Sequence, residues 1–150
     1  MSYQNNQSRP YYESLEDRAK QSAALRRLAT SWDVKIIETS PGSPWDGFLY
    51  RENSLAALVE FKARDIKNMS TIPHIFLSAK KYDITMSRAY DSDIKFYFMV
   101  EDADGSLWIA DLTNTELAVH KDSGRTKRTR DARDIEPCVH IPRSYFRRVE

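Results

Sequence analysis

The chain has 150 residues, which fits one domain, and its hydrophobic content of 41% excludes a largely disordered protein. No apolar run approaches the roughly 20 residues of a membrane span, and residues 1–10 lack the apolar centre of a signal peptide. The single cysteine, Cys138, excludes an intramolecular disulfide and a multi-cysteine zinc site. We therefore expect a cytoplasmic protein with no membrane partner, with one domain over residues 11–150 after a frayed segment over residues 1–10.

Charge is distributed unevenly along the chain. The net charge is +1, but residues 121–150 contain nine basic and five acidic residues, so the first 120 residues carry a small acidic excess. A basic loop without hydrophobic periodicity is expected over about residues 121–134. Such a segment either follows a nucleic-acid backbone or is a solvated tail. Its candidate nucleic-acid contacts are Arg125, Lys127, Arg128 and Arg130.

Hydrophobic periodicity predicts alternating helices and strands. The expected elements are a helix over residues 14–30, a strand over 34–39, a hairpin of strands 45–50 and 55–62, a helix over 71–89, strands over 94–100 and 107–112, and an edge strand over 138–141 before a short helix at Pro142.

Two features of this order define the fold class. The strand over residues 55–62 has apolar side chains on both faces, which is typical of a central strand covered on both sides. A helix lies between this strand and the one over residues 94–100, which permits a parallel, right-handed crossover. The sequence therefore predicts an α/β protein with a central mixed sheet and helices on both of its faces.

An acidic residue two positions before a lysine occurs four times, where about 1.3 occurrences are expected by chance. Only Glu60-Phe61-Lys62 ends a predicted central strand. If Arg51 pairs with Leu55 across the hairpin, Asp46 lies directly opposite Glu60. Opposed Cβ atoms are about 4.5–5.5 Å apart, and two carboxylates at that distance repel each other unless a cation lies between them.

These residues suit metal-assisted phosphodiester hydrolysis. Hard oxygen ligands favour Mg²⁺, with Mn²⁺ as a substitute, held by Asp46, Glu60 and the backbone carbonyl of Phe61. Lys62 lies on the same face of its strand as Glu60. It could orient the attacking water or offset the charge of the phosphate. The alternative is an ordinary surface hairpin with a Glu–Lys pair.

The order of Asp46 and Glu60-Phe61-Lys62, between a leading and a crossover helix, resembles the PD-(D/E)XK nuclease superfamily over about residues 11–112. The resemblance implies a restriction-endonuclease-like α-β-β-β-α-β core, metal binding by the two acids and a catalytic role for Lys62. Pro44 and Asp46 are separated by Trp45, which departs from the motif. The small size is similar to that of phage or mobile-element nucleases.

Further site residues follow from the same resemblance. Many members place a glutamate of the first helix near the metal, and Glu16 borders the apolar stripe. The alternative for Glu16 is an acid favoured by the helix N-terminus. On the crossover helix Lys81 could reach the phosphate, or it belongs to a solvated face. His74, His120 and His140 are scattered without ligand spacing and are interpreted as structural or surface residues.

The sequence therefore favours a magnesium-dependent deoxyribonuclease. RNA stays open as a substrate, and so does a homodimer. The alternative function is a catalytically silent module with a nuclease fold that binds nucleic acid or a partner protein. The intact set of Asp46, Glu60 and Lys62 favours the enzyme, because an inactive descendant is free to lose any of the three.

Overall fold

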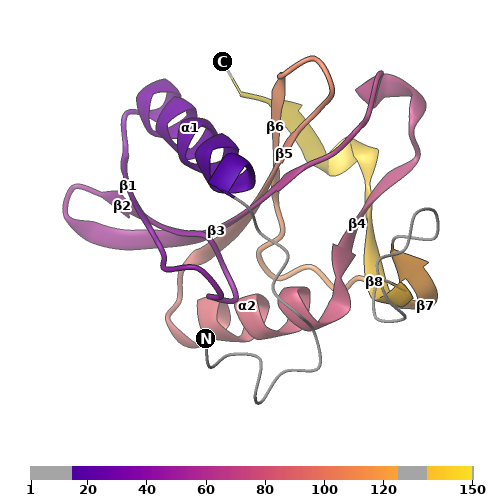
Figure 1. The fold of residues 1–150 in the computed structure, drawn as a ribbon. Helices are drawn as coiled ribbons and strands as arrows, with labels where there is room; N and C mark the ends of the chain where they lie inside the picture. Colours follow the sequence, from indigo (N-terminus) through magenta and orange to yellow (C-terminus); the bar gives the residue numbers. More distant parts are fainter. Residues whose placement is uncertain (1–14, 125–134, 150) are drawn as a thin grey trace.

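The computed structural model describes residues 15–124 and 135–149. The frayed start expected at residues 1–10 lies outside this range, and so do residues 125–134 of the basic loop expected over about 121–134. No helix among the described residues is long and apolar enough to cross a membrane. The elements are α1 (Leu15–Trp32), β1 (Lys35–Glu38), β2 (Gly47–Arg51), β3 (Ser54–Ala63), the 3-10 turn η2 (Met69–Thr71), β4 (His74–Ser78), α2 (Ala79–Asp91), β5 (Lys95–Glu101), β6 (Leu107–Asp111), β7 (Val119–Gly124), β8 (Ile135–Pro142), η4 (Arg143–Tyr145) and β9 (Phe146–Arg148) (Figure 1).

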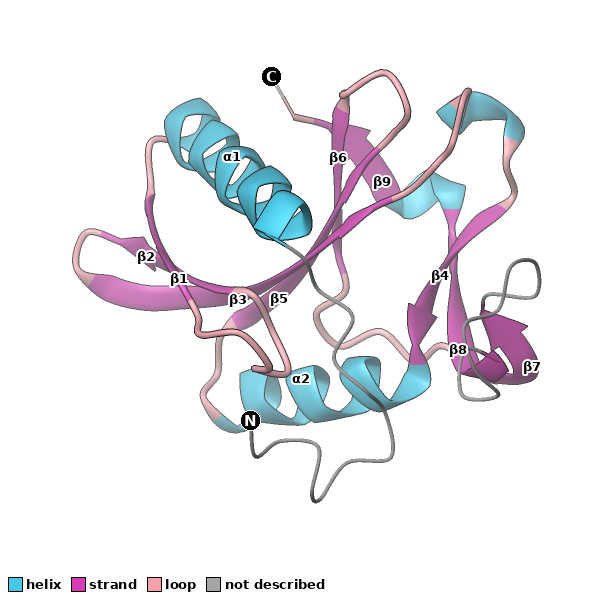
Figure 2. Cartoon of the chain, in the orientation of Figure 1, coloured by secondary structure: helices cyan, strands magenta, loops and turns pink. Residues whose placement is uncertain are grey.

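Six strands form the main sheet, in the order β1-β2-β3-β5-β6-β9. β3 and β5 run parallel, whereas the other neighbouring strands run antiparallel. A parallel pair needs a long crossover connection, and α2 lies within the segment that supplies it (Figure 2). The predicted mixed sheet with a crossover helix is confirmed.

Both faces of β3 are buried, as its apolar residues predicted. Val59 and Phe61 pack with Leu25 and Leu28 of α1, whereas Leu58 belongs to a second cluster that includes Tyr82 of α2. Successive side chains of a strand point to opposite faces, so each helix covers one face of the sheet. The first turn of α1 does not contribute to the core, because Leu15 is 90% exposed and burial in the helix begins only at Gln21.

A second sheet of three strands, in the order β4-β8-β7, was not predicted. The helix expected from residue 71 begins only at Ala79, and the segment before it is β4, which pairs with β8 from His74 to Ser78. Ile75 and Leu77 are buried and alternate with less buried neighbours, which is the period of a strand. A short apolar run is compatible with either period, and pairing with the distant β8 decides between them.

Other predictions for the C-terminal part are also wrong. The segment 138–141 belongs to β8, which is the central strand of the second sheet and not an edge strand. The backbone of residues 121–124 belongs to β7, so the basic loop cannot begin at 121. After Pro142 the chain forms the short turn η4, followed by β9 at the edge of the main sheet, a strand that no sequence signal indicated.

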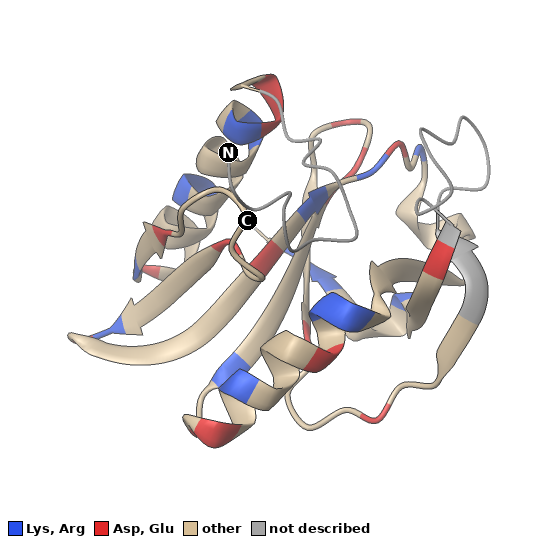
Figure 3. Ribbon diagram, turned by 60° about the horizontal axis from the view of Figure 1, so that its bottom comes forward, with Lys and Arg blue, Asp and Glu red and all other residues tan. Residues whose placement is uncertain are grey.

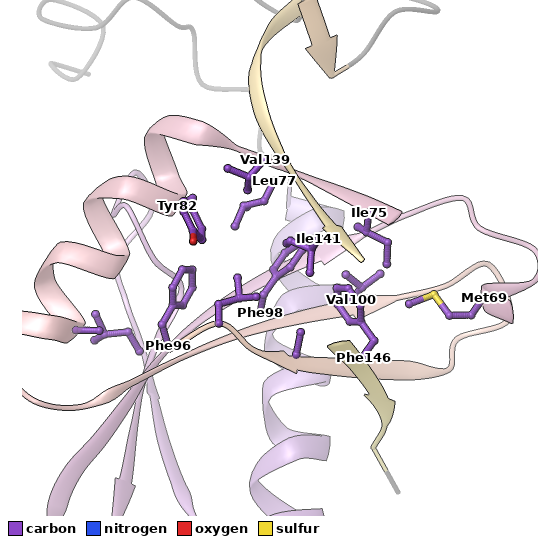
Figure 4. Close-up of a cluster of buried hydrophobic side chains, with 14 residues drawn as sticks. Met69, Ile75, Leu77, Tyr82, Phe96, Phe98, Val100, Val139, Ile141 and Phe146 are labelled. Atoms are coloured by element: carbon purple, nitrogen blue, oxygen red, sulfur yellow. The ribbon is translucent and has the colours of Figure 1, made fainter. Parts of the chain in front are cut away.

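The two sheets share one hydrophobic core. Side chains from the inner face of β4 and β8 meet residues of β5 and the ring of Phe146 in β9 (Figure 4). This contact fixes β4, and with it the start of α2, in front of the face of β3 that carries Glu60. The labelled members from the second sheet are Ile75, Leu77, Val139 and Ile141, and those from β5 are Phe96, Phe98 and Val100.

Candidate active site

The β2–β3 hairpin brings Asp46 to Glu60 through a register that differs from the predicted one at the turn. Arg51 pairs with Ser54, and not with Leu55 as predicted, because both residues of the two-residue turn adopt positive φ angles, 49° at Glu52 and 69° at Asn53. An irregularity between Leu49 and Tyr50 then shifts the register by one residue.

Beyond this shift the pairing is the predicted one, since Phe48 lies opposite Leu58. Asp46, directly before β2, extends the ladder: its backbone N–H donates to the carbonyl of Val59 at 2.8 Å. Its side chain is also held, because Oδ2 accepts a hydrogen bond of 2.8 Å from the backbone N–H of Phe61. The carboxylate of Asp46 is therefore positioned by the same strand that carries Glu60.

The backbone carbonyl of Phe61 lies on the same side of β3 as Asp46. In a ladder, the N–H and C=O groups of one residue point toward the same neighbouring strand. Since the N–H of Phe61 points to Asp46, its carbonyl points past the end of β2 and away from β5. Asp46, Glu60 and this carbonyl form a set of oxygen donors at one strand end.

Glu60 is buried, with only 1% of its side chain exposed, and two lysines contact one of its oxygens. The Nζ atom of Lys81 lies 3.1 Å and that of Lys62 lies 3.5 Å from Oε2. The other oxygen, Oε1, is buried and has no hydrogen-bond partner within the described chain. An unpartnered buried carboxylate oxygen is costly unless an additional donor or cation binds it.

The start of α2 places Lys81 beside Glu60. The hydroxyl of Ser78 caps the helix by accepting from the backbone N–H of Lys81 at 3.4 Å, and it donates to Oε2 of Glu136 in β8 at 3.0 Å. The first turn of α2 is thus tied to the second sheet. Figure 3 shows the basic and acidic positions of β3 beside the basic first turn of α2.

Burial and mutual charge shift the pKa values of three of these groups. Burial, followed by the charge of Glu60, raises the pKa of Asp46 to about 7, although Lys81, Lys62 and the N–H of Phe61 oppose the shift. Burial and the neighbouring charge of Lys81 lower the pKa of Lys62. Burial also disfavours the charged form of Lys81, but the charges of Glu60 and Asp46 outweigh it and raise its pKa.

The metal-free Asp46→Asn variant should be more stable than the parent at about pH 8 and lose this advantage near pH 4. A raised folded pKa means that protonated Asp46 stabilises the fold. This contribution is complete below the unfolded value of 3.8 and is lost as the pH rises through about 7. Allowing for partial exposure and screening, we expect a change of about 2 kcal/mol, measured by urea unfolding in chelator. If Asp46→Asn were more stable than the parent by the same amount at pH 8 and at pH 4, the raised pKa of Asp46 would be contradicted.

The other predicted site residues are not all brought together. Glu16 is exposed in the first turn of α1, and no contact between it and Asp46 or Glu60 exists within residues 15–124 and 135–149. Lys81 does reach the pair of acids. The residues of the basic loop, Arg125, Lys127, Arg128 and Arg130, lie outside the described residues.

Sequence reasoning missed two features near the site. Arg64 follows Glu60 and Lys62 at the spacing of one strand face, contributes to the lowered pKa of Lys62, and donates through Nη2 to the carbonyl of Phe76 at 3.2 Å. The alternation of Glu60, Lys62 and Arg64 was visible in the sequence. The grouping of the three histidines was not visible, because β4, β7 and β8 come together only in the folded chain.

The fold and the site define a class of protein. A mixed sheet covered by helices on both faces, with an acid before β2 and Glu-x-Lys at the end of β3, is a restriction-endonuclease-like arrangement. The sequence profile of the family described as "Phage putative PDDEXK endonuclease" matches residues 7–149, nearly the whole chain. The chain therefore belongs to this family. No curated protein matches the chain.

Proposed function

We propose that the protein is a divalent-metal-dependent nuclease that hydrolyses phosphodiester bonds of DNA at Asp46, Glu60 and Lys62. The observation that carries the proposal is the buried Oε1 atom of Glu60, which lacks a partner in the described chain beside the anchored carboxylate of Asp46. Membership of the endonuclease family supports the same class of reaction.

The donor set fits a hard cation. Carboxylate oxygens of Asp46 and Glu60 and the carbonyl of Phe61 are the ligands that Mg²⁺ prefers, and Mn²⁺ could replace it. Two protein carboxylates with water and substrate oxygens are a common set for Mg²⁺ at phosphate-processing sites. Bound there, the cation would lower the pKa of a water molecule and stabilise the charge that develops on the phosphate.

The chain's own residues supply the remaining functions. The backbone of β3 fixes both carboxylates, because Asp46 is held by Val59 and Phe61. Lys62 would orient the attacking water or contact the phosphate, and the position of its half-buried ammonium group beside Glu60 supports this role. Lys81 approaches the same carboxylate from α2 and is the second cation available for the phosphate.

Lys81 should also control how strongly the free protein binds metal. Its ammonium group contacts Oε2 of Glu60 at 3.1 Å. When a divalent cation binds Glu60, this group must move away, or the cation must bind against its repulsion. Lys81→Gln is therefore expected to raise the affinity of the free protein for Mn²⁺ by about tenfold, because a nearby positive charge is removed. The same variant should bind nucleic acid more weakly. Isothermal titration calorimetry and DNA binding in Ca²⁺ measure the two effects.

The adjacent Lys80 provides a matched control. It is exposed and shares the first turn of α2, but it has no contact with Glu60 in the described chain. Lys80→Gln should leave the affinity for Mn²⁺ unchanged. If both variants raised this affinity equally, a general charge effect would replace the specific role of Lys81.

The second candidate is a nuclease-fold module that binds nucleic acid without cutting it. The ion pairs of Lys62 and Lys81 with Glu60 favour this second candidate, because they partly neutralise the buried carboxylate without a metal. Incubation of supercoiled plasmid, single-stranded DNA and RNA with Mg²⁺, Mn²⁺ or chelator separates the candidates. Metal-dependent cutting that Asp46→Asn abolishes supports the nuclease. Binding without cutting under every condition supports the module.

A further inference from the structure

Three histidines form a column of stacked rings on the second sheet. His140 of β8 lies between the other two: its ring centroid is 4.1 Å from that of His74 in β4 and 3.8 Å from that of His120 in β7. The interplanar angles are only 6° and 5°, so the rings are parallel. The three histidines are scattered along the sequence, and pairing of three strands places them side by side in the fold.

The geometry of the column does not suit a transition metal. Metal-binding histidines direct ring nitrogens toward a shared point, whereas these rings present their faces to one another. No group of three metal-ligating side chains is found among the described residues. Burial and the neighbouring histidines lower the pKa of His140, so its ring is neutral near pH 7 and stacks as an uncharged aromatic.

The column lies on the outer face of the second sheet. The inner residues of β4 and β8 belong to the shared core. Phe76, whose ring packs against those of His74 and His140, belongs to neither buried cluster. His120, the last ring, is exposed and stands on the edge strand β7. One end of a stack of parallel rings therefore faces solvent.

A row of positive charge leads from the candidate active site to this sheet. Lys62 follows Glu60 in β3. Arg64, directly after the end of β3, donates to the backbone carbonyl of Phe76 in the middle of β4. Lys81 lies in the first turn of α2, which begins directly after Ser78 at the C-terminal end of β4. A phosphate backbone held by these cations would therefore run past the strand that begins the histidine column. Positive charge next to stacked rings is the combination that binds single-stranded nucleic acid.

We propose that the histidine column is a stacking platform for an unpaired base of the nucleic acid strand, which stacks on the exposed face of His120. The inference rests on the proposed function for its substrate class, and it deepens that function by assigning single-stranded or frayed nucleic acid as the preferred ligand. Stacking on a ring discriminates poorly between bases, since every base has a π-face. The platform therefore contributes affinity for unpaired strands without sequence preference. Base pairs of an intact duplex are already stacked and cannot use it.

The test compares binding of matched probes to the parent and to His120→Ala, in chelator so that nothing is cut. The probes are a labelled single-stranded DNA, its RNA counterpart, an abasic strand of equal length and the DNA duplex, measured by fluorescence anisotropy. His120→Ala should bind at least one base-containing single strand about tenfold more weakly, with less than about a twofold change for duplex and abasic strand. The dependence of affinity on salt should not change, because no charge that contacts phosphate is removed.

Substitutions with and without an aromatic ring separate stacking from structural effects. His120→Tyr should restore the single-strand affinity, whereas His120→Gln, which keeps a polar side chain, should not. Tyr90→Ala removes a 75% exposed ring from the other end of α2 and should have no effect. The platform is overturned if the parent binds no single strand, if His120→Ala binds it as the parent does, or if all four probes are weakened equally. Because no cutting is involved, failure of the nuclease proposal appears separately, as intact plasmid in the presence of metal.

Discussion

Asp46→Asn is expected to abolish DNA cleavage while leaving the protein folded and, at pH 8, more stable than the parent. Asparagine keeps the oxygen that accepts from the backbone N–H of Phe61, so the anchoring of the loop survives. The charge that helps to hold the cation is lost. The cleavage rate at saturating Mg²⁺ should fall by about a thousandfold or more, equivalent to about 4 kcal/mol of transition-state stabilisation.

This combination of effects distinguishes a lost metal ligand from general damage. Asp33→Asn is the matched control, because Asp33 is exposed after α1 and has a φ of 54°, which asparagine also tolerates. The control should cut plasmid at the parent rate. If Asp46→Asn cut DNA at the parent rate under saturating Mg²⁺, the role of Asp46 as a metal ligand would be wrong, whatever the stability of the variant.

Lys62→Met should lose turnover and keep metal binding. Methionine retains much of the aliphatic length of the half-buried side chain but removes the ammonium group that lies 3.5 Å from Oε2 of Glu60. If this group orients the attacking water or contacts the phosphate, the rate at saturating metal and DNA should fall by about 10²–10⁴-fold. The affinity for Mn²⁺ should be unchanged or higher, because Asp46, Glu60 and the carbonyl of Phe61 remain.

Calorimetry with Mn²⁺ and single-turnover cleavage separate the two properties. Lys67→Met is the control, since Lys67 is 85% exposed and pairs only loosely with Asp65 at 3.9 Å. Its cleavage rate should equal that of the parent. The role proposed for Lys62 would be wrong if the variant lost metal affinity while its rate at saturating metal stayed intact.

Local patterns of the sequence were sufficient for the centre of the fold. Apolar residues on both faces of residues 55–62 predicted a central strand, and β3 is buried on both faces. The predicted register places Phe48 opposite Leu58 and is correct next to Asp46, although the predicted pairing of Arg51 with Leu55 is wrong. The error at the turn and the irregularity between Leu49 and Tyr50 compensate each other. Alternating burial constrains a register strongly, because a slip by one residue would reverse every side chain.

The second sheet shows where local patterns fail. His74–Ser78 reads equally well as the start of a helix, and only pairing with β8 makes it a strand. The same pairing moves the start of α2 to Ala79. Lys81 therefore lies in the first turn of the helix, beside Glu60. The sequence named Lys81 as a candidate, but it contained no signal for this contact.

Sequence alone therefore determined the acid and lysine set of the candidate site, because Asp46, Glu60 and Lys62 lie on one hairpin whose geometry follows from periodicity and a short turn. Only the tertiary structure decided what surrounds that set. The contact of Lys81, the position of Arg64 and the stack of His74, His140 and His120 depend on strands that are distant in sequence. Such contacts form when apolar faces of separate segments are buried together in one core, and no local spacing records which segments will meet.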